Sequence, residues 1–235
     1  MTSAYPDPAL TIGHPHRLDT GEPIDTVVFD LGAVLIDWDP RHLYRSLFDG
    51  PEAEAAMEEF LANVCTPDWN LEQDRGRSLH EATEELVRRY PDRAELIRAY
   101  YGRWEEMVGE PIEGSVRITR ELRARGIRLV ALSNWSAETF ARVEHRLGFL
   151  DGFDGVLISG RVGLVKPDPA IFELFTKQYA VDVRHAVFID DSARNVEAGK
   201  RAGFDAIAFH SAEQLRSELV ARGLVEANPR RPPVD

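Results

Sequence analysis

Residues 26–39 read T-V-V-F-D-L-G-A-V-L-I-D-W-D. Val27, Val28 and Phe29 form an apolar run of residues that favour β-structure, and the run ends abruptly at Asp30. We therefore expect a buried strand that carries a carboxylate at its C-terminal end, where open α/β sheets place their chemistry. The alternative is that Asp30 only begins a turn, which is a common use of aspartate after a strand.

From Gly114 onward, helical and strand-like patterns alternate along the chain. Amphipathic stretches predict helices at 115–125, 136–148, 169–179, 193–202 and 212–222. Short apolar runs between them predict strands at 127–132, 155–159, 186–189 and 206–209. Strands separated by helices of this length predict an α/β fold, a Rossmann-like doubly wound parallel sheet with helices on both faces.

The segment between the first strand and this alternation is predicted to be helical from residue 41 to about 112. Helices are expected at 51–64, 78–89 and 92–107, and the second begins with the capping pattern S-L-H-E. Residues 1–23 are expected to form a loose N-terminal arm, and 226–235 a flexible tail. His14 and His16 have an H-x-H spacing, but no ligand cluster accompanies them in the arm, so a solvated tail is favoured over a metal site.

The composition excludes several classes of protein. The chain has 43% hydrophobic and 29% charged residues, which is typical of a globular protein. Its 40 acidic and 28 basic residues argue against a nucleic-acid partner, which would need concentrated Lys and Arg. The single cysteine, Cys65, cannot form an internal disulfide and is interpreted as a small buried apolar residue. No apolar run could span a membrane and no signal peptide is evident, so we expect a cytoplasmic protein without a membrane partner.

Several polar residues directly follow the expected strands: Asp30, Ser133, Asn134, Asp190 and Asp191. Because parallel strands end at the same edge of a sheet, we expect these residues to lie close together. Asp190 and Asp191 are adjacent carboxylates, which repel one another unless a cation compensates them. The pair therefore favours a metal site, although a turn and helix cap before Ala193 is the alternative.

Three further segments follow F-D-L-G in order: L-V-A-L-S-N at 129–134, G-L-V-K-P-D-P at 163–169 and V-F-I-D-D-S-A-R-N at 187–195. With these four motifs, residues 24–210 resemble the haloacid dehalogenase-like (HAD) hydrolases, a superfamily made mostly of magnesium-dependent phosphatases. The resemblance implies an α/β core formed by residues 24–39 and 113–225. It also implies that residues 40–112 are the inserted α-helical cap of the helical-cap branch.

The same resemblance implies a metal site and a nucleophile. Asp30 matches the aspartate that attacks phosphorus and forms an aspartyl-phosphate intermediate. Mg²⁺ would be held by Asp30, the Gly32 carbonyl, Asp190 and Asp191, since this hard cation prefers oxygen ligands. Between the two adjacent carboxylates, we favour Asp191 as the direct ligand and Asp190 as one that acts through water.

Other motif residues have expected roles toward the phosphoryl group and the rest of the substrate. The Ser133 hydroxyl and the main-chain amide of Asn134 match the groups that bind phosphoryl oxygens. Lys166 matches the lysine that balances the charge of the nucleophile and of the phosphate, and Asn195 would support the metal site. Trp135 follows the Ser-Asn pair, and the expected cap contributes Trp69, Asn70 and Asp74. These four residues could line a substrate pocket, although core packing is the more common role of tryptophan.

One position departs from the family pattern. Most phosphatases of the superfamily carry a second aspartate two residues after the nucleophile, and Gly32 occupies that position here. The missing carboxyl group normally protonates the leaving oxygen and then activates water. Some relatives with F-D-L-G, resembling glucose-1-phosphate phosphatases, hydrolyse sugar phosphates despite the glycine, and Asp37 or Asp39 could supply a substitute acid.

Three functions remain open on this basis. The leading one is a magnesium-dependent phosphatase that acts, as a monomer or homodimer, on a small phosphorylated metabolite, including a sugar phosphate. The second is a 2-haloacid dehalogenase, for which Gly32 is no handicap because halide leaves without a proton. The third is a HAD-fold binding protein without efficient turnover.

Overall fold

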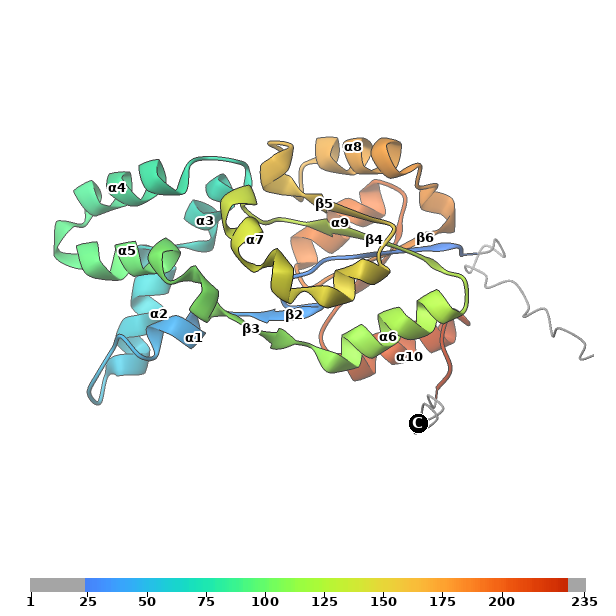
Figure 1. The fold of residues 1–235 in the computed structure, drawn as a ribbon, viewed down its shortest axis with the longest axis horizontal. Coiled ribbons are helices and arrows are strands. Elements are labelled where there is room, and N and C mark those ends of the chain that lie inside the picture. The colour runs from blue at the N-terminus through green and yellow to red at the C-terminus, as the bar shows by residue number, and fades with distance from the viewer. Residues whose placement is uncertain (1–23, 228–235) are drawn as a thin grey trace, which may run out of the picture.

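The computed structural model describes residues 24–227. Its centre is a five-stranded parallel sheet in the order β5-β4-β1-β6-β7 (Figure 1). The strands are β1 (Thr26–Phe29), β4 (Arg128–Ser133), β5 (Gly155–Ile158), β6 (Ala186–Asp190) and β7 (Asp205–Ala208). The predicted doubly wound α/β fold is confirmed, and each expected strand agrees with the structure to within one residue. The central place of β1 explains why its residues are apolar and buried on both faces.

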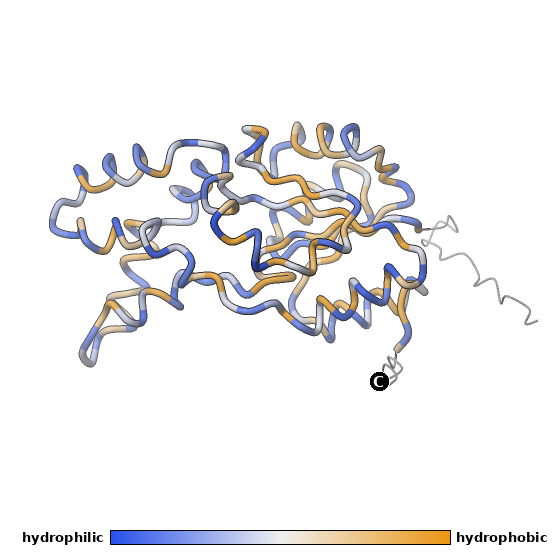
Figure 2. The backbone as a smooth tube through the Cα atoms, viewed as in Figure 1, coloured by the Kyte–Doolittle hydropathy of each residue, from blue (hydrophilic) through white to orange (hydrophobic). Residues whose placement is uncertain are grey.

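Helices cover both faces of this sheet (Figure 1). Successive residues of a strand point to opposite faces, so Val27 and Phe29 belong to one apolar cluster and Val28 to another. Figure 2 shows hydrophobic residues concentrated along the strands. The first cluster includes side chains of α6 (Glu113–Ala124), α7 (Ala137–Val143) and α10 (Ala212–Ala221), and the second includes side chains of α8 (Pro169–Tyr179) and α9 (Ala193–Arg201).

The helix predicted over 136–148 is shorter than expected. It ends at Val143 and continues as two 3₁₀ segments, Glu144–Arg146 and Gly148–Gly152. The tighter turns let Phe149, Leu150 and Phe153 pack against the first apolar cluster, and the ring centre of Phe153 lies 6.0 Å from that of Phe29. Burial of these aromatic residues therefore overrides the helical periodicity.

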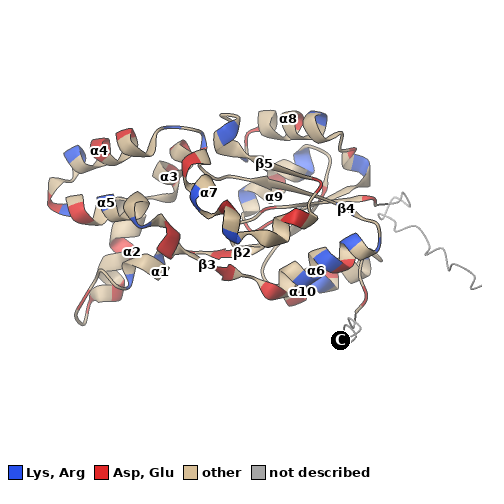
Figure 3. Cartoon of the chain, viewed as in Figure 1, with Lys and Arg blue, Asp and Glu red and all other residues tan. Residues whose placement is uncertain are grey.

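A helical segment lies beside the sheet (Figure 1). It contains α1 (Arg41–Tyr44), α2 (Ala53–Asn63), α3 (Pro67–Asp74), α4 (Leu79–Arg89) and α5 (Ala94–Gly102), with 3₁₀ turns at Pro91–Arg93 and Trp104–Met107. Basic and acidic residues both occur along helices such as α4 and α6 (Figure 3). Sequence reasoning did not separate α3, although Thr66 caps it by accepting a hydrogen bond from the Trp69 N–H at 3.0 Å, with Pro67 in its first turn.

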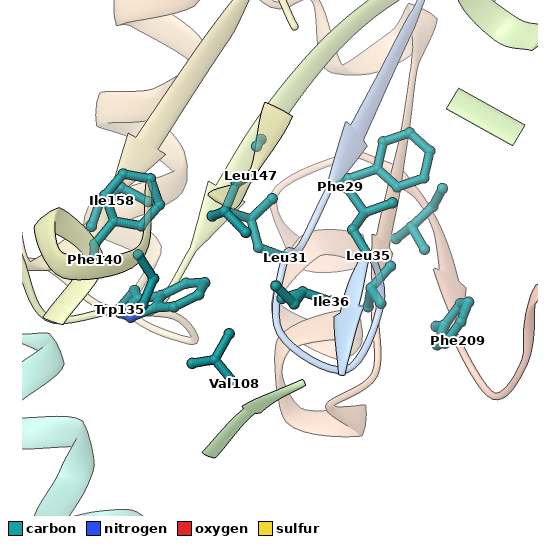
Figure 4. Close-up of a cluster of buried hydrophobic side chains, with 14 of the residues drawn as sticks. Phe29, Leu31, Leu35, Ile36, Val108, Trp135, Phe140, Leu147, Ile158 and Phe209 are labelled. Atoms are coloured by element: carbon teal, nitrogen blue, oxygen red, sulfur yellow. The ribbon is translucent and has the colours of Figure 1, made fainter. Parts of the chain in front are cut away.

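The expectation that residues 41–112 are helical throughout is wrong at its end. β3 (Val108–Pro111) pairs antiparallel with β2 (Ile36–Trp38), and together they link the helical segment to the sheet (Figure 1). Val108 and Ile36 belong to the buried cluster in Figure 4. Gly109 permits the pairing, because a Cβ there would lie 2.9 Å from the Asp37 carboxylate. Cross-strand contacts thus override the helical pattern.

The expected N-terminal arm, with His14 and His16, lies outside the described residues, as does the tail from residue 228 onward. Within residues 24–227, no helix combines the length and the apolar character that a membrane crossing requires.

Candidate active site

The C-terminal ends of three adjacent strands bring the predicted polar residues together. Asp30 follows β1, Ser133 ends β4 and Asp190 ends β6. One carboxylate oxygen from each of Asp30, Asp190 and Asp191 lies within 4.8 Å of the others. Residues that are up to 161 positions apart in the sequence therefore form one acidic cluster.

Lys166 is a buried cation between two of these carboxylates. Its side chain is 0% exposed, and its Nζ lies 3.1 Å from Asp30 Oδ1 and 2.6 Å from Asp190 Oδ2. The Nζ also donates a hydrogen bond to the Leu132 carbonyl oxygen at 2.7 Å. Since an ammonium group has three donors, these contacts occupy Lys166 fully. It compensates the carboxylates and has no donor left for a substrate.

Amide side chains hold this arrangement in place. The Asn134 Nδ2 donates to the Lys166 carbonyl at 2.9 Å, and its Oδ1 accepts from the Lys166 N–H at 2.8 Å. The Asn195 Nδ2 donates to Asp190 Oδ1 at 3.0 Å, and the Ser192 N–H donates to the same oxygen at 2.9 Å. Both oxygens of Asp190 are therefore engaged. The clamp between Asn134 and Lys166 was not predicted, because only the main-chain amide of Asn134 had an expected role.

The electrostatics of the cluster favour a bound cation. Burial raises the pKa of Asp30 to about 7; Lys166 lowers it, and Asp190 and Asp191 raise it. Desolvation and then Asp190 also raise the pKa of Asp191. Burial opposes the charge of Lys166, but Asp190 and Asp30 outweigh it and raise the pKa of this lysine. Three carboxylates against one ammonium leave excess negative charge, and their oxygens are the donors that Mg²⁺ prefers.

A cavity of about 640 Å³ opens over the cluster, between the sheet edge and the helical segment. We call its sheet side the floor, lined by Asp30, Gly32, Ser133, Asn134 and Asp191. We call its helical side the roof, lined by residues of α2, α3 and α5 that include Leu61, Asn70, Leu71, Asp74 and Tyr100. Lys166 and Asp190 are buried behind the floor.

Gly32 leaves room for a side chain at the floor. A Cβ on Gly32 would meet nothing closer than the Trp38 Cβ at 4.0 Å. Its backbone does not have a positive φ, so the position does not require glycine. The next residue, Ala33, does adopt a left-handed conformation with φ of 55°. The tight loop after β1 therefore presents the Gly32 backbone to the cavity without depending on glycine itself.

The two carboxylates suggested as substitute acids, Asp37 and Asp39, do not line this cavity. Asp37 Oδ2 lies 3.0 Å from His42 Nε2. Asp39 Oδ1 accepts a hydrogen bond from the Arg41 N–H at 2.9 Å, at the start of α1. The helical side of the cavity contributes two other carboxylates, Glu58, which is paired with Arg41, and Asp74.

The two tryptophans differ in their surroundings. Trp69 packs against Tyr100 and Tyr101, each with a ring-centre distance of 5.2 Å, so it contributes to packing of the helical segment. Trp135 is buried and lines a second cavity of about 60 Å³ together with Gly32 and Asp74. Its indole N–H has no hydrogen-bond partner among the described residues.

Several residues of the large cavity were missed by sequence reasoning. Cys65 is buried as predicted, and burial raises the pKa of its thiol to about 12, but it also lines the cavity. Arg41 and Glu58 line it too, and the Arg41 guanidinium donates to both Glu58 oxygens, at 2.5 and 2.7 Å. No motif marks these residues; only the tertiary arrangement of α1 and α2 around the cavity brings them there.

Comparison with known proteins agrees with this geometry. The family model for haloacid dehalogenase-like hydrolases matches residues 24–203, and the chain belongs to this family. The chain is 23% identical over 203 residues to the sesquiterpene phosphatase astK of Aspergillus oryzae, covering 84% of this chain and 95% of that protein. It is 25% identical over 202 residues to the drimenol cyclase drtB of Aspergillus calidoustus; this covers 83% of the chain but only 36% of that longer relative.

A solved structure has a similar fold. It is a HAD family enzyme of Bacteroides thetaiotaomicron in complex with magnesium and inorganic phosphate. The TM-score is 0.61 at 19% identity, and the match covers 80% of this chain and 95% of that one. At this identity the likeness concerns the fold.

Proposed function

We propose that this chain is a magnesium-dependent phosphatase that hydrolyses a small phosphorylated metabolite through an aspartyl-phosphate intermediate on Asp30. The observation that carries this proposal is the convergence of Asp30, Asp190 and Asp191 around one buried lysine at a cavity floor. A phosphate dianion would be repelled by this floor unless a divalent cation compensated it. The similarity to a relative named as a phosphatase supports the same reaction class.

The proposed metal site consists of Asp30, the Gly32 carbonyl, Asp191 and, through water, Asp190. Asp191 is the better direct ligand, because both oxygens of Asp190 already accept hydrogen bonds. Bound Mg²⁺ would compensate the charge of the phosphoryl group and polarise it for attack.

The protein groups would divide the remaining tasks. An Asp30 oxygen attacks phosphorus, and Lys166, whose Nζ lies 3.1 Å from Asp30 Oδ1, orients this carboxylate and favours its ionised form. The Ser133 hydroxyl lies at the floor and would bind a phosphoryl oxygen together with the Asn134 main-chain amide. The Asn134 side chain would act indirectly, because it is used in fixing Lys166.

The roof favours an organic group with apolar surface on the substrate. Leu61, Ala62, Cys65 and Leu71 line it beside Tyr100. A sugar would need several hydrogen-bonding partners, which these side chains do not offer, and the polar Asn70 and Glu58 are already bonded to Asp74, Tyr101 and Arg41. A sugar phosphate stays a prediction to be tested, and an alkyl or isoprenoid phosphate is the substrate class that we favour.

The dehalogenase alternative fits the cavity less well. A 2-haloacid carries a carboxylate that needs a cationic partner, and among the residues lining the large cavity the only cation is Arg41. Its guanidinium is already paired with Glu58 and Asp39. Without a metal, the acidic cluster would repel such a substrate.

The test is a substrate screen with the purified full chain. Release of inorganic phosphate is measured from p-nitrophenyl phosphate, sugar phosphates, and alkyl and isoprenyl monophosphates, and halide release from 2-chloropropionate. We expect phosphate release that EDTA abolishes and excess Mg²⁺ restores. Halide release that is insensitive to EDTA, without phosphatase activity, would replace this proposal with the dehalogenase function.

A further inference from the structure

The roof presents a buried carboxyl group next to the position where the floor has only glycine. Asp74 is the last residue of α3 and is 6% exposed. Both Asp74 and Gly32 line the large cavity over Asp30, and both also line the adjoining cavity of about 60 Å³. The structure therefore offers a carboxyl group close to the missing one, but from a different element of the chain.

We propose that Asp74 is the general acid and base of the reaction, and that it replaces from the roof the carboxyl group absent at Gly32. This inference rests on the phosphatase function proposed above. In the first step, an Asp30 oxygen bonds to phosphorus, the bond from phosphorus to the leaving oxygen breaks, and the Asp74 carboxylic acid gives its proton to that oxygen. In the second step, the Asp74 carboxylate takes a proton from a water molecule while the oxygen of that water attacks phosphorus. The bond from phosphorus to Asp30 breaks, and inorganic phosphate is released.

Neutral hydrogen-bond donors orient the Asp74 carboxyl group. The Asn70 Nδ2 donates to Asp74 Oδ2 at 3.0 Å, and Asn70 Oδ1 accepts from the Tyr101 hydroxyl at 2.9 Å. Gln73 Nε2 in turn donates to the Tyr101 hydroxyl at 3.1 Å. Within residues 24–227, Asp74 forms no ion pair with a Lys, Arg or His. A carboxyl group held only by neutral partners can give up and regain a proton without breaking a salt bridge.

The end of α3 is also anchored to the core beside the floor. The Ser159 hydroxyl donates to the Asp74 main-chain carbonyl oxygen at 2.6 Å and accepts from the Trp135 main-chain N–H at 2.9 Å. Trp135 directly follows Ser133 and Asn134 of the floor. Ser159 thus links the backbone that carries Asp74 to the backbone that carries the proposed phosphate-binding residues, which fixes the position of the acid.

The environment of Asp74 suits proton transfer near neutral pH. Burial raises its pKa to about 7; the Ser136 main-chain N–H lowers it, and the charge of Asp30 raises it. A general acid works best when its pKa lies near the operating pH. Asp37 differs, because its side chain is 55% exposed and pairs with His42.

The first test compares Asp74→Asn with Asp37→Asn as a matched control. Rates with Mg²⁺ are measured for aryl and alkyl phosphates whose leaving groups span a wide pKa range. In Asp74→Asn, kcat/KM for alkyl phosphates should fall about 10²- to 10⁴-fold, whereas release of a good leaving group such as p-nitrophenol in the first turnover should change only a few-fold. Asp37→Asn should match the natural chain throughout. If Asp74→Asn lowered the first-turnover rate by the same factor for all leaving groups, the proposal would be overturned.

The second test asks whether a carboxyl group at the floor replaces the one at the roof. A side chain at Gly32 has space, so Gly32→Asp combined with Asp74→Asn should recover at least about tenfold of the lost rate on alkyl phosphates. A purely structural role of Asp74 would not be rescued in this way. The natural chain gives a check that needs no variant. With Asp74 as acid, its rate should depend only weakly on the pKa of the leaving group, and a strong dependence would overturn the proposal. Absence of any phosphatase activity would instead contradict the proposed function itself.

Discussion

The floor and the roof of the cavity both contain buried aspartates, but their partners differ. At the floor, Lys166 lies 3.1 Å from Asp30 and 2.6 Å from Asp190. At the roof, the hydrogen-bond donors of Asp74 are neutral groups, the amide of Asn70 and the main-chain N–H of Ser136. A cation stabilises the ionised carboxylate, whereas burial without a cation favours the protonated acid. The comparison teaches that burial raises the pKa of both carboxyl groups, and that a cationic partner is what distinguishes the one proposed as an anion from the one proposed as an acid.

This distinction holds although burial raises the pKa of Asp30 to about 7, as it does for Asp74. At the floor, the negative charges of Asp190 and Asp191 contribute to the raised pKa of Asp30. Bound Mg²⁺ would compensate these charges and so lower that pKa. The roof has no such cluster around Asp74.

The largest expected effect is at the floor. Asp30→Asn should lower kcat at least about 10⁴-fold, because an amide cannot attack phosphorus to form the covalent intermediate. Turnover with Mg²⁺ is measured on the best substrate of the screen, and mass spectrometry after rapid quenching detects phosphate on Asp30 in the natural chain.

Asp37→Asn is the matched control, since it makes the same chemical change outside the cavity. It should keep full activity. An Asp30→Asn variant with near-normal turnover and an unchanged melting temperature would rule out the covalent mechanism.

The next effect distinguishes the roles of the adjacent carboxylates Asp190 and Asp191. Asp191 is exposed and Asp190 is 0% exposed with both oxygens bonded. Asp191→Asn should raise the half-saturating Mg²⁺ concentration about 10- to 100-fold with little change in stability. Asp190→Asn should also destabilise the fold by about 3–5 kcal/mol, because it breaks a buried ion pair and leaves Lys166 with one carboxylate fewer.

Magnesium titrations of activity and urea denaturation check this contrast. The roles of the two carboxylates would be reversed if Asp190→Asn left the stability unchanged while Asp191→Asn lowered it.

The third expected effect is on stability and concerns the roof. Because burial raises the pKa of Asp74 from 3.8 to about 7, the stability that its protonated form provides is fully present below about pH 4 and is lost as the pH rises through about 7. Asp74→Asn cannot ionise. It should therefore stabilise the fold at about pH 8 by up to about 4 kcal/mol, and much less at about pH 4, while it lowers activity.

The measurement is chemical denaturation at both pH values in EDTA. The titratable groups that interact with Asp74 are Asp30 below it and Tyr100 and Tyr101 on α5, so the comparison is repeated in the Asp30→Asn background. A stability difference that does not change with pH would mean that Asp74 is not buried as an acid.

The sheet and the floor were largely predictable because their signals are local. Apolar runs located the strands to within one residue, and a polar residue after each run marked the floor, since parallel strands end at one edge. The prediction failed where a contact between distant segments decides the conformation. Val108 to Pro111 are in a strand because they pair with β2, and the helix after Ser136 ends early because Phe149 and Phe153 pack against the core.

The sequence by itself determined the α/β architecture, the order of the motifs and the polar residues that follow each strand, because strand periodicity and the parallel-sheet rule act over a few residues at a time. Only the tertiary structure decided that Lys166 lies between Asp30 and Asp190, and that Asp74 faces the cavity next to Gly32. The spacing of apolar residues specifies which face of a helix is buried but not which residue of another element it meets. That choice depends on the packing of Trp69 against Tyr100 and Tyr101, and on the bond from Ser159 to the end of α3.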